Sequence, residues 1–132
     1  MNDSISSELN PTVLIVDDSS LSRKLIADLL NGEGFHIIFG KGGKDAIEIL
    51  SETKVDCLLL DLLMPDVDGF DVLGFIQKND IKVPSIVISA DIQDTTRKQV
   101  ESLGAFGFLN KPPQKDETIK VIKDAISHKY GG

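Results

Sequence analysis

The sequence lacks several features that mark whole classes of protein. Cys57 is the only cysteine among 132 residues, so no internal disulfide can form, and a reducing, cytoplasmic compartment is expected. No apolar stretch approaches the ~20 residues that a membrane-spanning helix needs. Basic residues are outnumbered, with 14 lysines and arginines against 21 aspartates and glutamates. The resulting net charge of −7 argues against direct binding to nucleic acid or to an anionic membrane.

The chain length fits one domain with a hydrophobic core. We find no internal repeat and no low-complexity tract in it. The first ten residues have neither the basic start nor the apolar run of a signal peptide. The sequence therefore predicts a polar, mobile tail over residues 1–11, one domain over residues 12–129 and a frayed C-terminus over residues 130–132.

Short apolar runs alternate with helical patterns along this domain. The runs predict five strands, at residues 13–16, 36–39, 57–60, 83–88 and 106–109. Helices are predicted around residues 20–30, 46–50, 70–76, 93–102 and 114–128. Apolar strands joined by helices are typical of a parallel sheet covered on both faces. With right-handed crossovers we expect a flavodoxin-like α/β fold, a three-layer sandwich with strand order 2-1-3-4-5.

Some local features carry weaker expectations. Leu21, Leu25 and Leu29 recur at helical spacing and predict an apolar face for the first helix. The glycines of residues 40–43 are misspaced for a dinucleotide-binding loop and indicate a turn. Gly74 lies inside a predicted helix, where it suggests close packing. The helix over residues 93–102 has few apolar anchors, which predicts a loosely held, movable element.

Acidic residues follow two of the predicted strands. Asp17 and Asp18 come directly after residues 13–16, and Asp61 ends the run that begins at Cys57. In the expected strand order these strands are neighbours, so their carboxyl ends bring the three carboxylates together. Carboxylates so close repel one another and call for a cation. Mg²⁺, which prefers oxygen ligands and retains water, suits such a site better than Ca²⁺, because the loop lacks an EF-hand ligand pattern.

The fourth and fifth predicted strands deliver Ser89 and Lys111 to the same edge. Taken singly, each residue has an ordinary role: a strand-end hydroxyl for Ser89 and a solvated amine for Lys111. Together with the acids they fit phosphoryl transfer to a carboxylate. Asp61 would be the nucleophile, the metal and Lys111 would neutralise the phosphoryl oxygens, and Ser89 would donate a hydrogen bond. A carboxylate needs no general base at neutral pH.

With these residues the chain resembles response regulator receiver domains of the CheY-like kind. The matching segments are VLIVDD at residues 13–18, DLLMPDVDG at residues 61–69, ISA at residues 88–90 and GAFGFLNKP at residues 104–112. The resemblance extends over about residues 12–128. It implies a signalling protein that catalyses only its own phosphorylation and dephosphorylation, rather than an enzyme that turns over an external substrate.

The resemblance also implies a role for each site residue. Asp61 accepts a phosphoryl group from a sensor histidine kinase or a phosphotransfer protein, in a two-component phosphorelay. Mg²⁺ is held by Asp17, Asp18, Asp61 and the backbone carbonyl of Leu63.

Further roles concern the response to phosphorylation. Lys111 contacts the phosphoryl oxygens and Asp18 or Asp61, often before a cis bond to Pro112. Ser89 is the switch hydroxyl and Phe108 the switch aromatic. A downstream target protein binds the face built from the fourth helix, the fifth strand and the fifth helix.

Two positions depart from the family pattern. Leu63 stands where the family often has a polar residue, and an apolar side chain there would screen attacking water, which affects the lifetime of the phosphorylated form. Pro113 directly follows Pro112 and delays the start of the last helix, next to the output face.

Several alternatives remain open. The chain is expected to be a stand-alone regulator, but an excised receiver of a hybrid kinase or a phosphorelay shuttle has the same features. A haloacid-dehalogenase-type phosphatase wants a second aspartate two residues after the nucleophile, where Leu63 stands. A flavodoxin-like nucleotide binder wants a phosphate-binding loop after the first strand, where residues 17–20 read DDSS.

Overall fold

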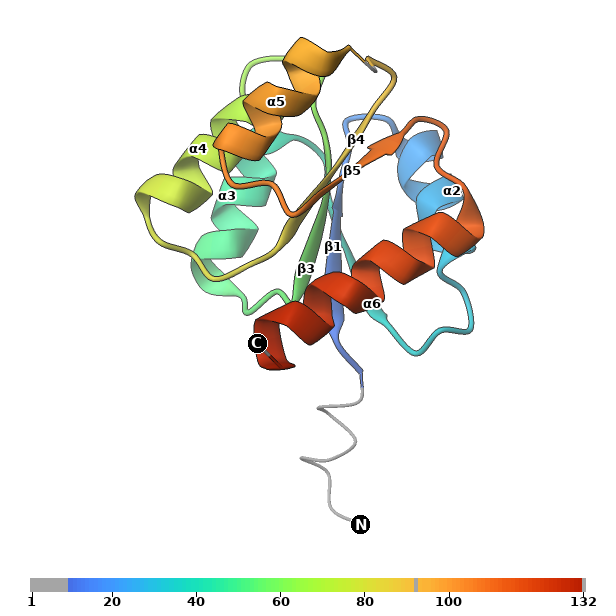
Figure 1. Cartoon of the computed structure of the whole chain (residues 1–132). Coiled ribbons are helices and arrows are strands. Elements are labelled where there is room, and N and C mark those ends of the chain that lie inside the picture. The colour runs from blue at the N-terminus through green and yellow to red at the C-terminus, as the bar shows by residue number, and fades with distance from the viewer. Residues whose placement is uncertain (1–9, 92, 132) are drawn as a thin grey trace.

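The computed structural model describes residues 10–91 and 93–131, over which strands and helices alternate (Figure 1). In chain order the elements are β1 (Thr12–Val16), α2 (Ser20–Leu29), β2 (His36–Gly40), α3 (Gly43–Glu52), β3 (Cys57–Asp61), α4 (Gly69–Lys78), β4 (Ser85–Ser89), α5 (Asp94–Ser102), β5 (Gly107–Asn110) and α6 (Lys115–Gly131). The strands form one parallel sheet in the order β2-β1-β3-β4-β5. The predicted flavodoxin-like topology is confirmed.

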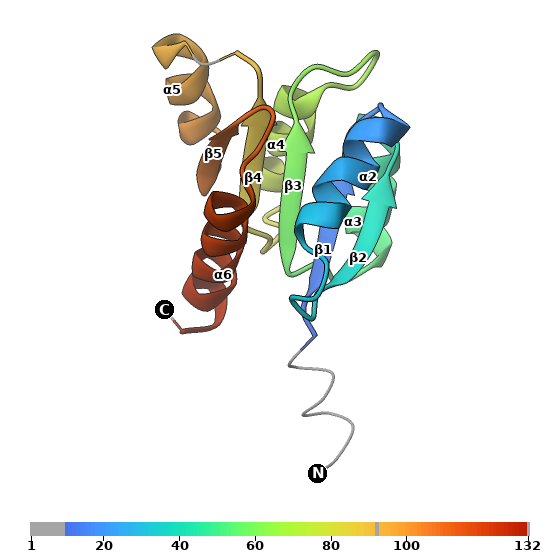
Figure 2. The same ribbon diagram turned by 90° about the vertical axis from the view of Figure 1, so that its right-hand side faces the viewer.

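Helices cover both faces of the sheet, so the central strands are buried on both sides. Helices α3, α4 and α5 lie on one face, and α2 and α6 lie on the other (Figures 1 and 2). Alternate residues of each strand point to opposite layers: Leu58 and Leu60 pack with the first group of helices, and Cys57 and Leu59 with the second. Burial on both faces explains why these strands are continuous apolar runs rather than alternating ones.

The strand register brings the carboxyl ends of four strands to one edge. Val16 pairs with Leu60, so the residues after them, Asp17 and Asp61, lie side by side at the ends of β1 and β3. Ser89 ends β4 opposite Asn110 of β5, and Lys111 follows Asn110. This edge is where open parallel sheets bind ligands.

Several local expectations are altered by the structure. Gly74 does not mark close packing, because a Cβ atom built there would meet nothing within 4 Å, and that prediction is wrong. Helix α6 begins one residue later than predicted, after Pro112 and Pro113, and continues to Gly131. Helix α5 is anchored by Val100, as expected, and also by the buried hydroxyl residue Thr96.

The ends of the chain bear on two further points. Residues 1–9 of the predicted tail lie outside the described residues, and the domain boundaries stay a prediction. Among the helices that the structure describes, none has the length and apolar character needed to cross a bilayer.

Helix α2 shows the largest departure from the sequence pattern. The predicted apolar face is largely uncovered, because Leu21 is 65% exposed and Leu25 is 56% exposed. The residues that the helix buries against the sheet are Ile26 and, just after the helix, Leu30. Helix α2 therefore presents one apolar face to the core and leaves a second one uncovered.

Candidate acidic phosphoryl-transfer site

Asp17 is fixed at the end of β1 by the turn that leads into α2. One carboxylate oxygen accepts a hydrogen bond from the Ser19 backbone N–H at 2.9 Å, and the Asp17 carbonyl accepts one from Arg23 Nη1 at 2.7 Å. The Ser19 side chain in turn accepts from the N–H of Ser22 and caps the helix. Asp17 is buried, whereas the neighbouring Asp18 is exposed.

Asp61 lies at the end of β3, beside this pair. Its side chain is buried, and oxygen atoms of Asp17, Asp18 and Asp61 all lie within 4.8 Å of one another. The predicted convergence of three carboxylates is thus present in the fold. An all-oxygen set with one exposed member fits a hard cation that keeps part of its water shell.

Lys111 reaches the acidic cluster from the loop between β5 and α6. Its Nζ lies 2.9 Å from Asp17 Oδ2 and 3.7 Å from Asp61 Oδ1. Its backbone N–H donates to the Ser89 carbonyl at 2.9 Å, which fixes the loop to the end of β4. The Lys111–Pro112 peptide bond is cis. The shortest contact of the ammonium is with Asp17, and the expected contact with Asp61 is longer.

The electrostatics of the cluster set Asp61 apart. The pKa of Asp61 is raised from 3.8 to about 6, first by burial and then by the charges of Asp17 and Asp18, while Lys111 and the Leu63 backbone act to lower it. Burial acts to lower the pKa of Lys111, but its hydrogen bond to Asp17 and the charge of Asp61 outweigh this and raise it. One ammonium therefore does not compensate the carboxylates, and a further cation would be favoured here.

Ser89 connects the acidic edge to helix α5 through hydrogen bonds. The buried Ser89 hydroxyl accepts from the Asp91 N–H at 3.0 Å. The Asp91 carboxylate accepts from Gln93 N–H at 3.1 Å and from Thr96 Oγ1 at 2.6 Å, and these bonds lower its pKa. Asp91 therefore takes the place of a side-chain cap, which Gln93 itself does not provide. Asp91 and Thr96 are not among the predicted site residues, although an aspartate just before a helix is a capping signal.

Phe108 lies on β5 and packs against the core layer that contains α5. The Arg97 guanidinium carbon of α5 lies 4.9 Å from the centre of its ring, within the range of a cation–π contact. Helix α5 thus contacts the predicted switch aromatic through Arg97 and is linked to the predicted switch hydroxyl indirectly, because Thr96 bonds Asp91 and Asp91 bonds Ser89.

Leu63 lies in the loop after Asp61 with its side chain 71% exposed. Its backbone acts to lower the pKa of the Asp61 carboxyl. The expected effect of its side chain on attacking water stays a prediction.

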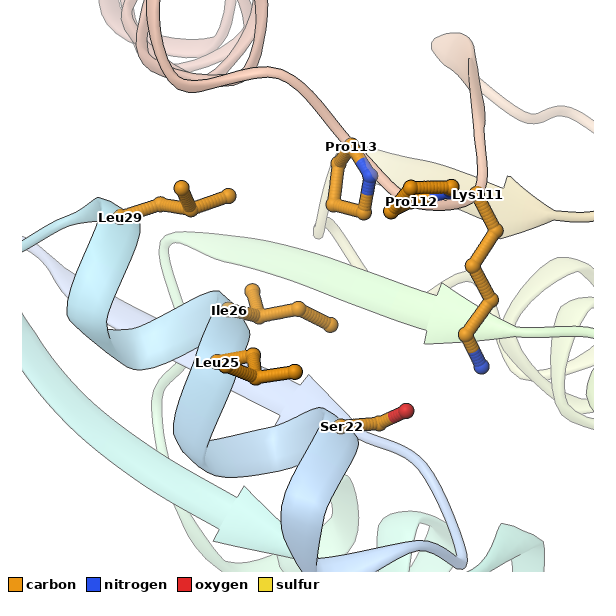
Figure 3. Close-up of a pocket in the computed structure, with 7 residues that line it drawn as sticks. All are labelled: Ser22, Leu25, Ile26, Leu29, Lys111, Pro112 and Pro113. Atoms are coloured by element: carbon orange, nitrogen blue, oxygen red, sulfur yellow. The ribbon is translucent and has the colours of Figure 1, made fainter.

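An apolar groove of about 240 Å³ opens beside Lys111 (Figure 3). It runs between α2 and the loop before α6 and is lined by Ser22, Leu25, Ile26, Leu29, Lys111, Pro112 and Pro113. The figure shows the α2 side chains and the two prolines facing each other across it. The leucine spacing of α2 does not predict this groove, because it does not show which parts of the fold cover that face.

The chain is similar to receiver domains along most of its length. Residues 13–123 match the family model described as response regulator receiver domain. The response regulator RR06 of Streptococcus pneumoniae is 39% identical over 119 residues, which are 89% of this chain and 54% of that protein. A protein-glutamate methylesterase/protein-glutamine glutaminase of Pyrococcus abyssi is 36% identical, over 86% of this chain and 34% of its own length. The chain thus spans about half or less of these curated relatives.

Solved structures give the same answer about the fold. The signal receiver domain of a putative LuxO repressor protein from Vibrio parahaemolyticus superposes with a TM-score of 0.88 at 30% identity, over 92% of this chain and 93% of that one. The receiver domain of the Francisella response regulator 1452 gives 0.85 at 26% identity, over 90% and 98%.

Proposed function

This chain belongs to the response regulator receiver domain family, and we propose that it is a phospho-acceptor in two-component signalling whose Asp61 takes a phosphoryl group from a phosphohistidine. The observation that carries the proposal is the meeting of Asp17, Asp18 and Asp61 within 4.8 Å, with Lys111 beside two of them. Neither a haloacid-dehalogenase-type phosphatase nor a nucleotide binder is supported by the family match.

The chemistry follows from the charges of the site. A carboxylate oxygen of Asp61 attacks phosphorus while the phosphorus–nitrogen bond of the donor breaks, and the leaving imidazole keeps the electron pair. Lys111 neutralises the oxygens of the transferred group. Asp17, Asp18, Asp61 and the Leu63 carbonyl would hold Mg²⁺, which supplies further neutralisation of those oxygens when bound. No proton has to leave Asp61, because the charged form is the nucleophile.

The groove beside Lys111 is a suitable surface for the phosphodonor protein. The groove is lined by the exposed Leu25 together with Lys111, so a helix seated there would present a phosphohistidine to Asp61. We propose that a sensor histidine kinase or a phosphotransfer protein docks on it. The lone Cys57 fits a cytoplasmic setting for that exchange.

The downstream response is proposed to run through α5. When the Ser89 hydroxyl turns to a phosphoryl oxygen it gives up its bond with the Asp91 N–H, which loosens the Asp91 contacts with Thr96 and lets Phe108 turn inward. The face of α5, β5 and α6 would then favour its target-binding form. The stand-alone role expected from the sequence stays a prediction.

Incubation with acetyl phosphate and Mg²⁺, followed by intact mass measurement, tests the acceptor. We expect one added phosphoryl group on the wild-type chain, none without metal and none on Asp61→Asn. Asp66→Asn is the matched control, because it removes an exposed acid from the same loop and should leave the adduct intact. An adduct that persists on Asp61→Asn, or that forms equally in EDTA, would contradict the proposal.

Ser89→Ala tests the switch separately from the chemistry. We expect the variant to accept the phosphoryl group, although more slowly, and to lose the phosphorylation-dependent shift of the Phe108 ring resonances in NMR spectra. Ser85→Ala is the control, since Ser85 is a buried serine at the other end of β4 whose hydroxyl has no hydrogen-bond partner among the described residues. An unchanged shift of the Phe108 ring resonances in Ser89→Ala would contradict the proposed coupling.

A further inference from the structure

Gly43, the first residue of α3, touches the loop that follows Asp61. It is buried, and a Cβ atom built on it would clash with the Val67 carbonyl oxygen and lie 2.8 Å from the Val67 carbonyl carbon. Real Cβ atoms essentially never approach other atoms so closely. The backbone of Val67 therefore occupies the space that any side chain at position 43 would need.

Helix α3 has little freedom to retreat from this contact. Ala46, one turn along, is fully buried, and its N–H donates to the Gly42 carbonyl at 3.0 Å. Ala46 and Leu50 belong to the core layer beneath α3. Because packed cores resist displacement, a side chain at position 43 would move the loop rather than the helix.

The loop over residues 62–68 is closed at its base and would move largely as a unit. The Gly69 N–H donates to the Leu62 carbonyl at 2.9 Å, and Asp68 and Asp71 form a reciprocal capping box at the start of α4. Asp66, in the middle of the loop, has a φ of 66°, in the left-handed region that few L-residues adopt. A push at Val67 would thus be transmitted toward Leu63.

Leu63 follows Asp61 by two residues at the start of this loop, and its backbone acts to lower the pKa of the Asp61 carboxyl. We propose that Gly43 is a positioning residue, which lets the Val67 backbone approach α3 and so holds the Leu63 backbone at the depth where it meets Asp61 and a bound cation. This inference rests on the proposed function, since the Leu63 carbonyl is a ligand only under that proposal. Gly43 itself touches neither metal nor phosphoryl group.

Gly43→Ala and Gly42→Ala form a matched pair for the test. A Cβ atom at Gly42 would meet nothing within 4 Å, and its φ of 174° suits any residue. In ¹⁵N-labelled, metal-free protein we expect the Leu63 and Asp61 amide resonances to shift in Gly43→Ala but not in Gly42→Ala. In Mg²⁺ titrations we expect the dissociation constant of Gly43→Ala to rise by roughly tenfold or more, the effect typical of a lost supporting contact, and that of Gly42→Ala to stay within about twofold.

A folded Gly43→Ala chain with wild-type Mg²⁺ affinity and unshifted Leu63 would overturn the inference. If Gly43→Ala does not fold, Val67→Ala probes the side-chain part of this contact from the loop side, because the Val67 Cγ1 atom lies 2.7 Å from the place of a Cβ atom at position 43. Weaker Mg²⁺ binding is then expected, and unchanged binding would overturn it. Failure of the wild-type chain to bind Mg²⁺ would instead refute the proposed function, while the metal-free shift of Leu63 would still decide the role of Gly43.

Discussion

Lys111→Met should slow phosphorylation by acetyl phosphate by roughly a hundredfold or more, the usual cost of removing one group that neutralises the transition state. The same change should strengthen Mg²⁺ binding, because Asp17 and Asp61 lose the ammonium that now lies 2.9 Å and 3.7 Å from them and competes with the metal. Slower transfer with tighter metal binding is a combination that general damage to the site would not produce.

The variant should also be less stable without metal. Two buried carboxylates would lose their only close cation among the described ion pairs, which for this partly exposed lysine should cost about 1–3 kcal/mol. Lys115→Met is the control, since Lys115 is exposed at the start of α6. Rapid phosphorylation of Lys111→Met, or Mg²⁺ binding weaker than in the wild-type chain, would show that Lys111 does not act on the acceptor as described.

Asp61→Asn should stabilise the metal-free chain near neutral pH by about 3 kcal/mol, the equivalent of a pKa raised from 3.8 to about 6. Asp61→Asn is stabilising because the folded chain binds a proton at Asp61 more tightly than the unfolded chain does. A carboxyl whose folded pKa is raised contributes stability that is fully present below pH 3.8 and is lost as the pH rises through about 6, where the buried group must ionise. The gain from the neutral amide should therefore fade as the pH falls from about 7 toward 4.

Urea unfolding of both chains in EDTA, across this pH range, measures the difference directly. Carboxylates outside the acidic cluster titrate alike in both proteins and cancel, whereas Asp17 and Asp18 feel the lost charge of Asp61. Asp124→Asn, which removes an exposed acid on α6, should show no such pH-dependent gain. Saturating Mg²⁺ should reverse the order, since it binds the charged wild-type site. Equal stabilities of wild type and Asp61→Asn at pH 7 in EDTA would mean that Asp61 ionises there without penalty.

The convergence of the acidic residues was predictable because it depends on topology alone. An apolar run that ends in Asp17 and another that ends in Asp61 must meet if their strands are parallel neighbours, whatever the side chains between them do. The same rule brings Ser89 and Lys111 to that edge, so knowledge of atomic packing was not needed.

The features that the sequence did not predict correctly depend on packing between helices, strands and loops. Periodicity indicates that Leu21 and Leu25 share a face of α2, but it does not say whether protein covers that face, and here none of the described residues does so fully. The glycines of residues 40–43 indicated a turn, yet nothing in their spacing distinguishes Gly43, which contacts Val67, from Gly42, which has open space around it. The close backbone approach predicted at Gly74 occurs instead at Gly43.

The direction of the strands determines where a fused tag or domain would lie relative to the acidic cluster. Strand β1 begins and helix α6 ends at the edge of the sheet opposite Asp61, as Figures 1 and 2 show. A purification tag, a fluorophore or a second folded module joined directly before β1 or after α6 would therefore emerge on the far side of the molecule, leaving the entrance to the carboxylates clear. Grafting the chain into a larger polypeptide would thus be compatible with phosphorelay input.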